Sequence, residues 1–186
     1  MSRMLVWLLA GLAAFAAVPA MAEQLTVQAH ERKWNGQVWD GAEVYGPLVL
    51  PTNTPPDLAV CLVGQEGLPQ CTERVDGRQR KSECQNSHSC TFRVRMDAKE
   101  PVGIMIYDID LRHDDLVDIV IIVPDERMPP DRYRGVEARL RELMDTRSRV
   151  FTPMERDRRA RATQVLTRAQ CATGCNLVQS RITLAP

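Results

Sequence analysis

One acidic stretch of the chain holds the side chains best suited to chemistry. Residues 107–118 read Tyr-Asp-Ile-Asp-Leu-Arg-His-Asp-Asp-Leu-Val-Asp and lie between two apolar runs. Their carboxylates belong to Asp108, Asp110, Asp114, Asp115 and Asp118. Because side chains alternate between the two faces of a strand, Asp108 and Asp110 point to the same side as the chain leaves a sheet. Carboxylates this close repel one another unless a cation lies among them. Ca²⁺ is the expected ion, because it takes about six to eight oxygen ligands in a flexible shell.

An EF-hand loop is the obvious candidate for such a site, and the residues exclude it. Counting from Asp108, the sixth position is His113, where the EF-hand needs glycine for its sharp turn. The twelfth position is Ile119, where the EF-hand needs a bidentate glutamate.

The stretch resembles the third calcium-binding loop of a C2 domain, the calcium- and phospholipid-binding β-sandwich. That loop reads roughly aromatic-D-x-D, a short tip, and then D-D followed by two hydrophobic residues and glycine. Here Tyr107-Asp108-Ile-Asp110 is followed by the tip Leu-Arg-His and by Asp114-Asp115-Leu116-Val117. Two features depart from the pattern: Asp118 stands in place of the final glycine, and the tip is one residue shorter than in common examples.

The resemblance implies a second acidic loop after the first strand. Asp40 follows Trp39, and Pro56-Asp57-Leu58-Ala59-Val60 resembles the S/P-D-P-Y-V entry to the second C2 strand, although Leu58 replaces a proline and the segment 41–55 is long. The resemblance covers residues 24–123 and the last strand. It implies a Ca²⁺ site built from Asp40, Asp57, Asp108, Asp110 and Asp115, with Asp114 as an accessory ligand.

Two other interpretations of the acidic stretch stay open. It could be a solvated turn in a sandwich whose metal site is vestigial and whose role is protein interaction, or it could serve a metal-dependent hydrolase. The chain has no G-x-S-x-G, H-E-x-x-H or glycine-rich phosphate loop. We therefore expect a protein that is not an enzyme and that contacts an anionic membrane surface or a protein partner through its calcium-binding end or a basic helical segment.

The elements that position these residues are mainly strands. Apolar alternation or short apolar runs predict strands in residues 24–33, 58–63, 90–96, 102–107 and 116–123. Without helices between them, they favour an antiparallel β-sandwich. After Pro124, Val136, Leu140, Leu143 and Met144 form the stripe of an amphipathic helix.

A second helix is predicted from Thr152-Pro153-Met154-Glu155, a cap residue with proline at the first helical position, to about Arg168. The two helices form an Arg-rich insertion at about residues 131–168. A closing strand follows at 176–184, where Val178, Ser180, Ile182 and Leu184 alternate with polar residues. Residues 23–186 are thus expected to form a single C2-like domain.

The first 22 residues read as a signal peptide, with Arg3, an apolar stretch and the small-x-small site Ala20-Met21-Ala22. We therefore expect an exported protein, periplasmic or secreted. Its six cysteines are an even number without a C-x-x-C pair, which favours disulfides over zinc. The sequence leaves the pairing open, with local pairs such as Cys171–Cys175 favoured.

The charges balance overall but are unevenly distributed. The chain has 24 Lys and Arg against 24 Asp and Glu, which argues against nucleic-acid binding because that needs a surplus of cations. Residues 23–125 carry 17 acidic and 10 basic side chains, and residues 126–186 carry 7 and 13. One half therefore suits cations and the other suits anions.

Overall fold

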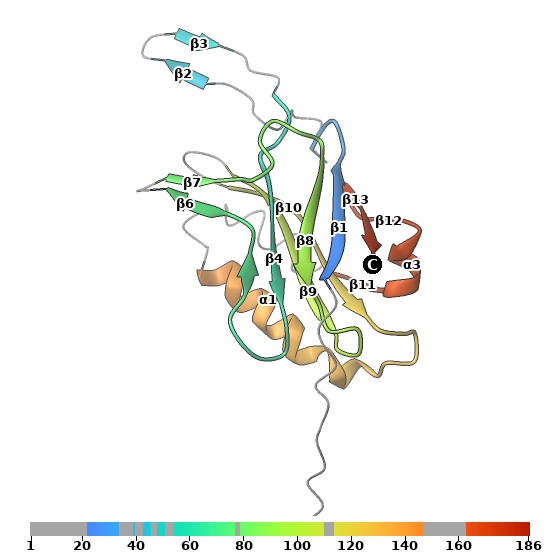
Figure 1. The fold of residues 1–186 in the computed structure, drawn as a ribbon. Coiled ribbons are helices and arrows are strands. Elements are labelled where there is room, and N and C mark those ends of the chain that lie inside the picture. Colours follow the sequence, from blue (N-terminus) through green and yellow to red (C-terminus); the bar gives the residue numbers. More distant parts are fainter. Residues whose placement is uncertain are drawn as a thin grey trace, which may run out of the picture.

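The chain folds into two β-sheets with one long helix on the outside of the second (Figure 1). The computed structural model describes residues 22–33, 39, 43–45, 48–50, 54–76, 79–109, 114–146 and 163–186. The first sheet has the strand order β12-β13-β1-β8 and the second β11-β10-β9-β4-β5. All described pairings are antiparallel except that of β10 with β11.

The first sheet consists of β1 (Ala22–Ala29), β8 (Ser89–Arg95), β12 (Cys175–Asn176) and β13 (Ser180–Ala185). The second consists of β4 (Leu58–Val63), β5 (Gln70–Cys71), β9 (Val102–Asp108), β10 (Asp115–Val123) and β11 (Gln164–Thr167). Two short hairpins are formed by β2 (Glu43–Tyr45) with β3 (Leu48–Leu50) and by β6 (Arg74–Asp76) with β7 (Gln79–Lys81). The helices are η1 (Pro130–Arg132), α1 (Arg134–Thr146) and α3 (Arg168–Ala172).

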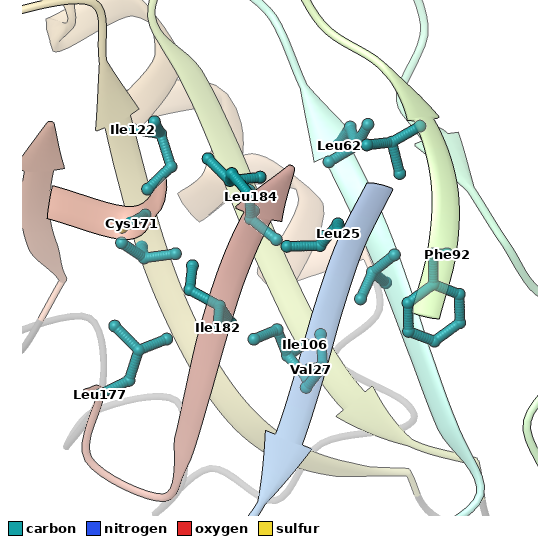
Figure 2. Packing of buried hydrophobic residues seen from close by; sticks show 14 of the residues in the cluster. Leu25, Val27, Leu62, Phe92, Ile106, Ile122, Cys171, Leu177, Ile182 and Leu184 are labelled. Atoms are coloured by element: carbon teal, nitrogen blue, oxygen red, sulfur yellow. The ribbon is translucent and has the colours of Figure 1, made fainter. Parts of the chain in front are cut away.

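The main core lies between the two sheets (Figure 2). Leu25 and Val27 of β1 and Phe92 of β8 point across to Ile106 of β9 and Leu62 of β4. The first sheet is buried on this face only, which is why β1 and β8 alternate apolar and polar residues. The predicted sandwich is confirmed.

A second core lies between the other face of the second sheet and α1. Val136, Leu140 and Met144 of the helix are at most 3% exposed there, as their spacing predicts. With both faces covered, β4 and β9 are buried along their whole length. This explains the unbroken apolar runs in these strands, because a strand covered on both sides has no solvent face for polar residues.

The prediction of a second helix to Arg168 is wrong for its last part. Residues 147–162 lie outside the described residues, but Gln164–Thr167 form β11, which pairs in parallel with Val120–Val123 of β10. A capping box then starts α3: the Thr167 hydroxyl accepts from the Gln170 N–H, and the Gln170 side chain accepts from the Thr167 N–H.

The predicted closing strand is also shorter than expected. Ser180, Ile182 and Leu184 of β13 point inward, but Val178 is 53% exposed. It lies in the turn between β12 and β13, where the Leu177 N–H donates to the Ser180 carbonyl at 2.7 Å. The alternation of Val178 with Ser180, Ile182 and Leu184 is therefore interrupted by a turn that reverses the chain.

Three disulfides join each cysteine to the next cysteine along the chain: Cys61–Cys71, Cys84–Cys90 and Cys171–Cys175. The local pairing expected for the last two cysteines is confirmed. Three disulfides are typical of a protein that folds in an oxidising compartment. Residues 1–21, which include most of the predicted signal peptide, lie outside the described residues. Among the described helices, none combines the length and apolar character of a membrane span.

The packing of α1 on β9 depends on a glycine. A Cβ at Gly103 would meet Leu140 Cδ1 at 2.6 Å and Val136 Cγ1 at 2.9 Å, whereas one at Gly135 would meet nothing within 4 Å. We predict that Gly103→Ala lowers the free energy of unfolding by about 1–3 kcal/mol through overpacking. Gly135→Ala, the control, changes it by at most about 1 kcal/mol, in the stabilising direction. Urea denaturation measures both, and equal effects would contradict this packing.

Candidate functional site

Asp57 and Asp108 are 51 residues apart in the sequence and touch in space. The N–H of Asp57 donates to Oδ1 of Asp108 at 2.6 Å, and the N–H of Ile109 donates to the carbonyl of Asp57 at 3.0 Å. The register of the second sheet causes this contact, because Asp108 lies opposite both Leu58 and Asp115. Three strands therefore bring acidic residues to one end of the sandwich, as the resemblance implied for Asp57, Asp108 and Asp115.

The Asp57 carboxylate closes the loop that follows β7. Its Oδ1 accepts from the N–H of Asn86 at 2.7 Å. Asn86 has φ 50°, the left-handed conformation that asparagine tolerates better than most residues. The disulfide Cys84–Cys90 holds the two sides of this loop together. Asp57 therefore has a structural role at this end, whatever else it binds.

Asp114 is fully buried and forms a bidentate ion pair with Arg80. Nη1 of Arg80 donates to Oδ2 of Asp114, and Nη2 donates to Oδ1. Nη1 also reaches Oε2 of Glu73 at 3.2 Å. Burial alone lowers the pKa of Arg80, but the carboxylates of Asp114 and Glu73 outweigh it and hold that pKa above its ordinary value. The guanidinium is thus a permanent positive charge between two carboxylates.

Asp115 is paired with a second cation of the chain. Nζ of Lys33 donates to its Oδ2, and the two side chains are only 14% and 21% exposed. The same Nζ lies 5.5 Å from the centre of the Trp39 ring, within the range of a cation–π contact. Trp39 is itself buried, with Nε1 donating to the carbonyl of His30 at 2.7 Å. Lys33 is therefore fixed from two sides.

Asp118, where the C2 pattern has glycine, holds the entry to the last strand. Its Oδ2 accepts from the Gln179 N–H at 2.9 Å and from the Ser180 hydroxyl at 2.7 Å, and the residue is 4% exposed. The register of β9 and β10 shifts between Leu116 and Asp118. This carboxylate serves the fold by joining the second sheet to β13 of the first.

The structure describes four of the six aspartates predicted to bind Ca²⁺. Asp57, Asp108, Asp114 and Asp115 lie at the same end, whereas Asp40 and Asp110 lie outside the described residues. Within the part of the chain that the structure describes, no three His, Cys, Asp or Glu side chains are grouped as they would be to hold a metal ion. The Ca²⁺ site stays a prediction.

Sequence reasoning missed the two cations of this end, Arg80 and Lys33. Arg80 lies in β7 of the short β6–β7 hairpin, which comes between β5 and β8 along the chain. No motif joins it to Asp114, 34 residues later. Lys33 is 82 residues from Asp115. The available signal was the excess of aspartates in residues 107–118, because any of these carboxylates that is buried needs a positive partner from elsewhere in the chain.

Comparison with known proteins adds little. No family model matches the chain, and no curated protein matches it. Among solved structures, two of human GIVD cytosolic phospholipase A2 in complex with methyl gamma-linolenyl fluorophosphonate are similar, one of them also with terbium chloride. Each is 19% identical to this chain over 60% of its length, with TM-scores of 0.27 and 0.23. The chain spans about 15% of the length of that enzyme, and a likeness of this size supports no argument about function.

The Arg80–Asp114 pair can be tested through stability. We predict that Arg80→Met lowers the free energy of unfolding by about 3–5 kcal/mol, because it removes the guanidinium that contacts both oxygens of the buried Asp114 carboxylate. Lys81→Met is the matched control on the same strand. Lys81 forms an exposed pair with Asp76 at 3.2 Å, so its loss should cost at most about 1 kcal/mol. A similar small loss in both variants, measured by urea denaturation, would contradict the pairing.

Proposed function

We propose that this chain is an exported, non-enzymatic β-sandwich that binds a protein partner and whose acidic end is neutralised by its own cations. The observation that carries the proposal is the bidentate contact of Arg80 with the fully buried Asp114. Lys33 on Asp115 supports it. Together they supply two positive charges at the end where the C2 resemblance implies a divalent ion.

Competition for the same oxygens favours this proposal over a resident Ca²⁺. Both oxygens of Asp114 already accept a hydrogen bond from Arg80, and Oδ1 of Asp108 accepts one from the Asp57 N–H. An ion that took Asp114 would have to displace a guanidinium that is 28% exposed and leave it beside Glu73 alone. Separating a partly buried pair costs several kcal/mol, which the ion would have to offset.

A second candidate is the C2-like module that binds Ca²⁺ and contacts a membrane surface or a protein. The direct contact between Asp57 and Asp108 favours it, because carboxylates from two remote segments lie side by side at one end. Asp40 and Asp110 would complete the shell in this candidate, with Asp115 released from Lys33. Calcium would then link the two loops on binding.

Export is supported by the three disulfides and by the N-terminal pattern of residues 1–22. Disulfides persist in periplasmic and extracellular proteins and are rare where thiols are kept reduced. In this proposal they brace the loop of Cys84–Cys90 at the acidic end, the β4–β5 pair and the turn after α3. The lack of a recognised nucleophile or metalloprotease motif supports a binding role.

Thermal unfolding of the mature protein distinguishes the two candidates. A site filled at about one hundred times its Kd adds about 2.7 kcal/mol, which raises Tm by roughly 5–10 °C in a chain of this size. The proposal predicts the same Tm in millimolar calcium, magnesium or chelator. A calcium-selective rise that is lost in Asp108→Asn with Asp110→Asn would establish the second candidate instead, and calcium-dependent sedimentation with liposomes would then test its membrane contact.

A further inference from the structure

One long strand of the sandwich has an open edge. β8 is the last strand of its sheet and pairs only with β1 among the described strands (Figure 1). The N–H of Ala29 donates to the carbonyl of His88 at 2.7 Å, and this pair continues the β1–β8 register. Because hydrogen-bonded pairs alternate along an antiparallel ladder, the next ones along β8 are Cys90, Phe92 and Val94.

The residues between them direct their backbone groups to the other side. By the same alternation, the N–H and C=O groups of Thr91, Arg93 and Arg95 point away from β1. Within the described part of the chain, no hydrogen bond from that side reaches these groups. Ser89 differs, because its carbonyl accepts from the Ser87 hydroxyl at 2.7 Å. Three donors and three acceptors therefore lie in a row at the edge, with roughly 7 Å between equivalent groups.

A groove runs beside this edge. One cavity of about 480 Å³ is lined by Arg93, Val94 and Arg95 of β8, by Leu62, by the chain from Gln70 to Arg74, and by Glu83, whose carboxylate is paired with Arg74. A second cavity of about 550 Å³ shares Leu62, Gln70 and Arg95 with the first and continues past Met96. The space beside β8 thus continues past the end of this strand and is bounded on its other side by the chain around Gln70.

The charges at this edge select the occupant. Arg93 and Arg95 are exposed, and neither has an ion-pair partner among the described residues. The arginines around them differ in this respect, since Arg74 is paired with Glu83 and Arg132 lies 3.6 Å from Glu100. Two unpaired cations at alternate positions of one strand match two carboxylates at alternate positions of a neighbouring strand.

We propose that the β8 edge binds an extended acidic segment of a partner protein by strand addition. The segment's backbone bonds to Thr91, Arg93 and Arg95, two of its carboxylates lie opposite Arg93 and Arg95, and the residue between them is apolar and enters the groove beside Val94 and Leu62. A second copy of this chain is a poor occupant, because antiparallel pairing of two β8 edges places arginines against arginines. This inference rests on the proposed partner-binding function and names the surface and the chemistry of the partner.

Backbone amide exchange gives the most specific test. In the mature protein alone, the amides of Thr91, Arg93 and Arg95 should exchange rapidly while those of Phe92 and Val94 are protected. A probe peptide, Ac-Thr-Asp-Val-Asp-Thr-Val-NH₂, should slow exchange of the first three amides at least tenfold. Unchanged exchange of these amides at saturating peptide would overturn the proposal. Protection that depends on protein concentration without peptide would also overturn it, in favour of a second copy.

Charge-reversal variants test the recognition of the peptide. We predict that Arg93→Glu with Arg95→Glu weakens binding at least tenfold, measured by fluorescence anisotropy. The control, Arg127→Glu with Arg134→Glu, makes the same charge change on exposed residues near α1 and should stay within twofold of wild type. The peptide with Asn for both Asp should lose binding in the wild type. Equal binding by both double variants, or by both peptides, would overturn the proposal.

The test of strand addition and the test of the proposed function can fail independently. A calcium-selective rise in Tm with peptide binding intact removes the proposed neutralisation of the acidic end and leaves strand addition standing. An insensitive Tm with no amide protection by the peptide removes strand addition alone.

Discussion

A buried carboxylate needs a positive partner, and the acidic end of this sandwich is arranged around that constraint. Asp114 is fully buried, and Arg80 stabilises its charge there by donating to both of its oxygens. The β6–β7 hairpin, which carries Arg80, is thereby joined to the start of β10. Lys33 and Asp115 repeat the arrangement beside it. At this end of the sandwich, beyond the apolar core between the sheets, these ion pairs therefore hold the connecting segments together.

The acidic end and the β8 edge differ in how their polar groups are satisfied. At the acidic end, Asp57, Asp108 and Asp118 accept hydrogen bonds from backbone N–H groups of distant segments. At the β8 edge, the outward backbone groups of three residues have no such partner in the described chain. On the second sheet, α1 covers the outer face and buries its apolar side chains. The proposed strand addition uses the open ladder at the β8 edge and leaves the polar contacts of the acidic end in place.

Much of the fold could be predicted from the sequence, because strand alternation and the stripe of Val136, Leu140 and Met144 report burial directly. The strand at Gln164–Thr167 could not be predicted from the sequence. It pairs with β10, and this tertiary contact outweighs the helical pattern of the preceding residues. At the site, the resemblance to C2 domains implied that Asp57 lies beside Asp108, and the register explains why it does. The pairing of Asp114 with Arg80 and of Asp115 with Lys33 could not be predicted, because ion pairs between remote residues leave no periodic signal in the sequence.

A double-mutant cycle on Arg80 and Asp114 tests most directly whether the chain's own cation holds the acidic end. The free energy of unfolding is measured for Arg80→Met, Asp114→Leu and the double variant. Arg80→Met takes the guanidinium away from the buried Asp114 carboxylate, Asp114→Leu leaves the guanidinium beside Glu73, and the double change removes both charges of the pair. The account predicts that the double variant is more stable than Arg80→Met, with a coupling free energy of about 2–3 kcal/mol between the two positions. Additive losses, with a coupling near zero, would contradict it.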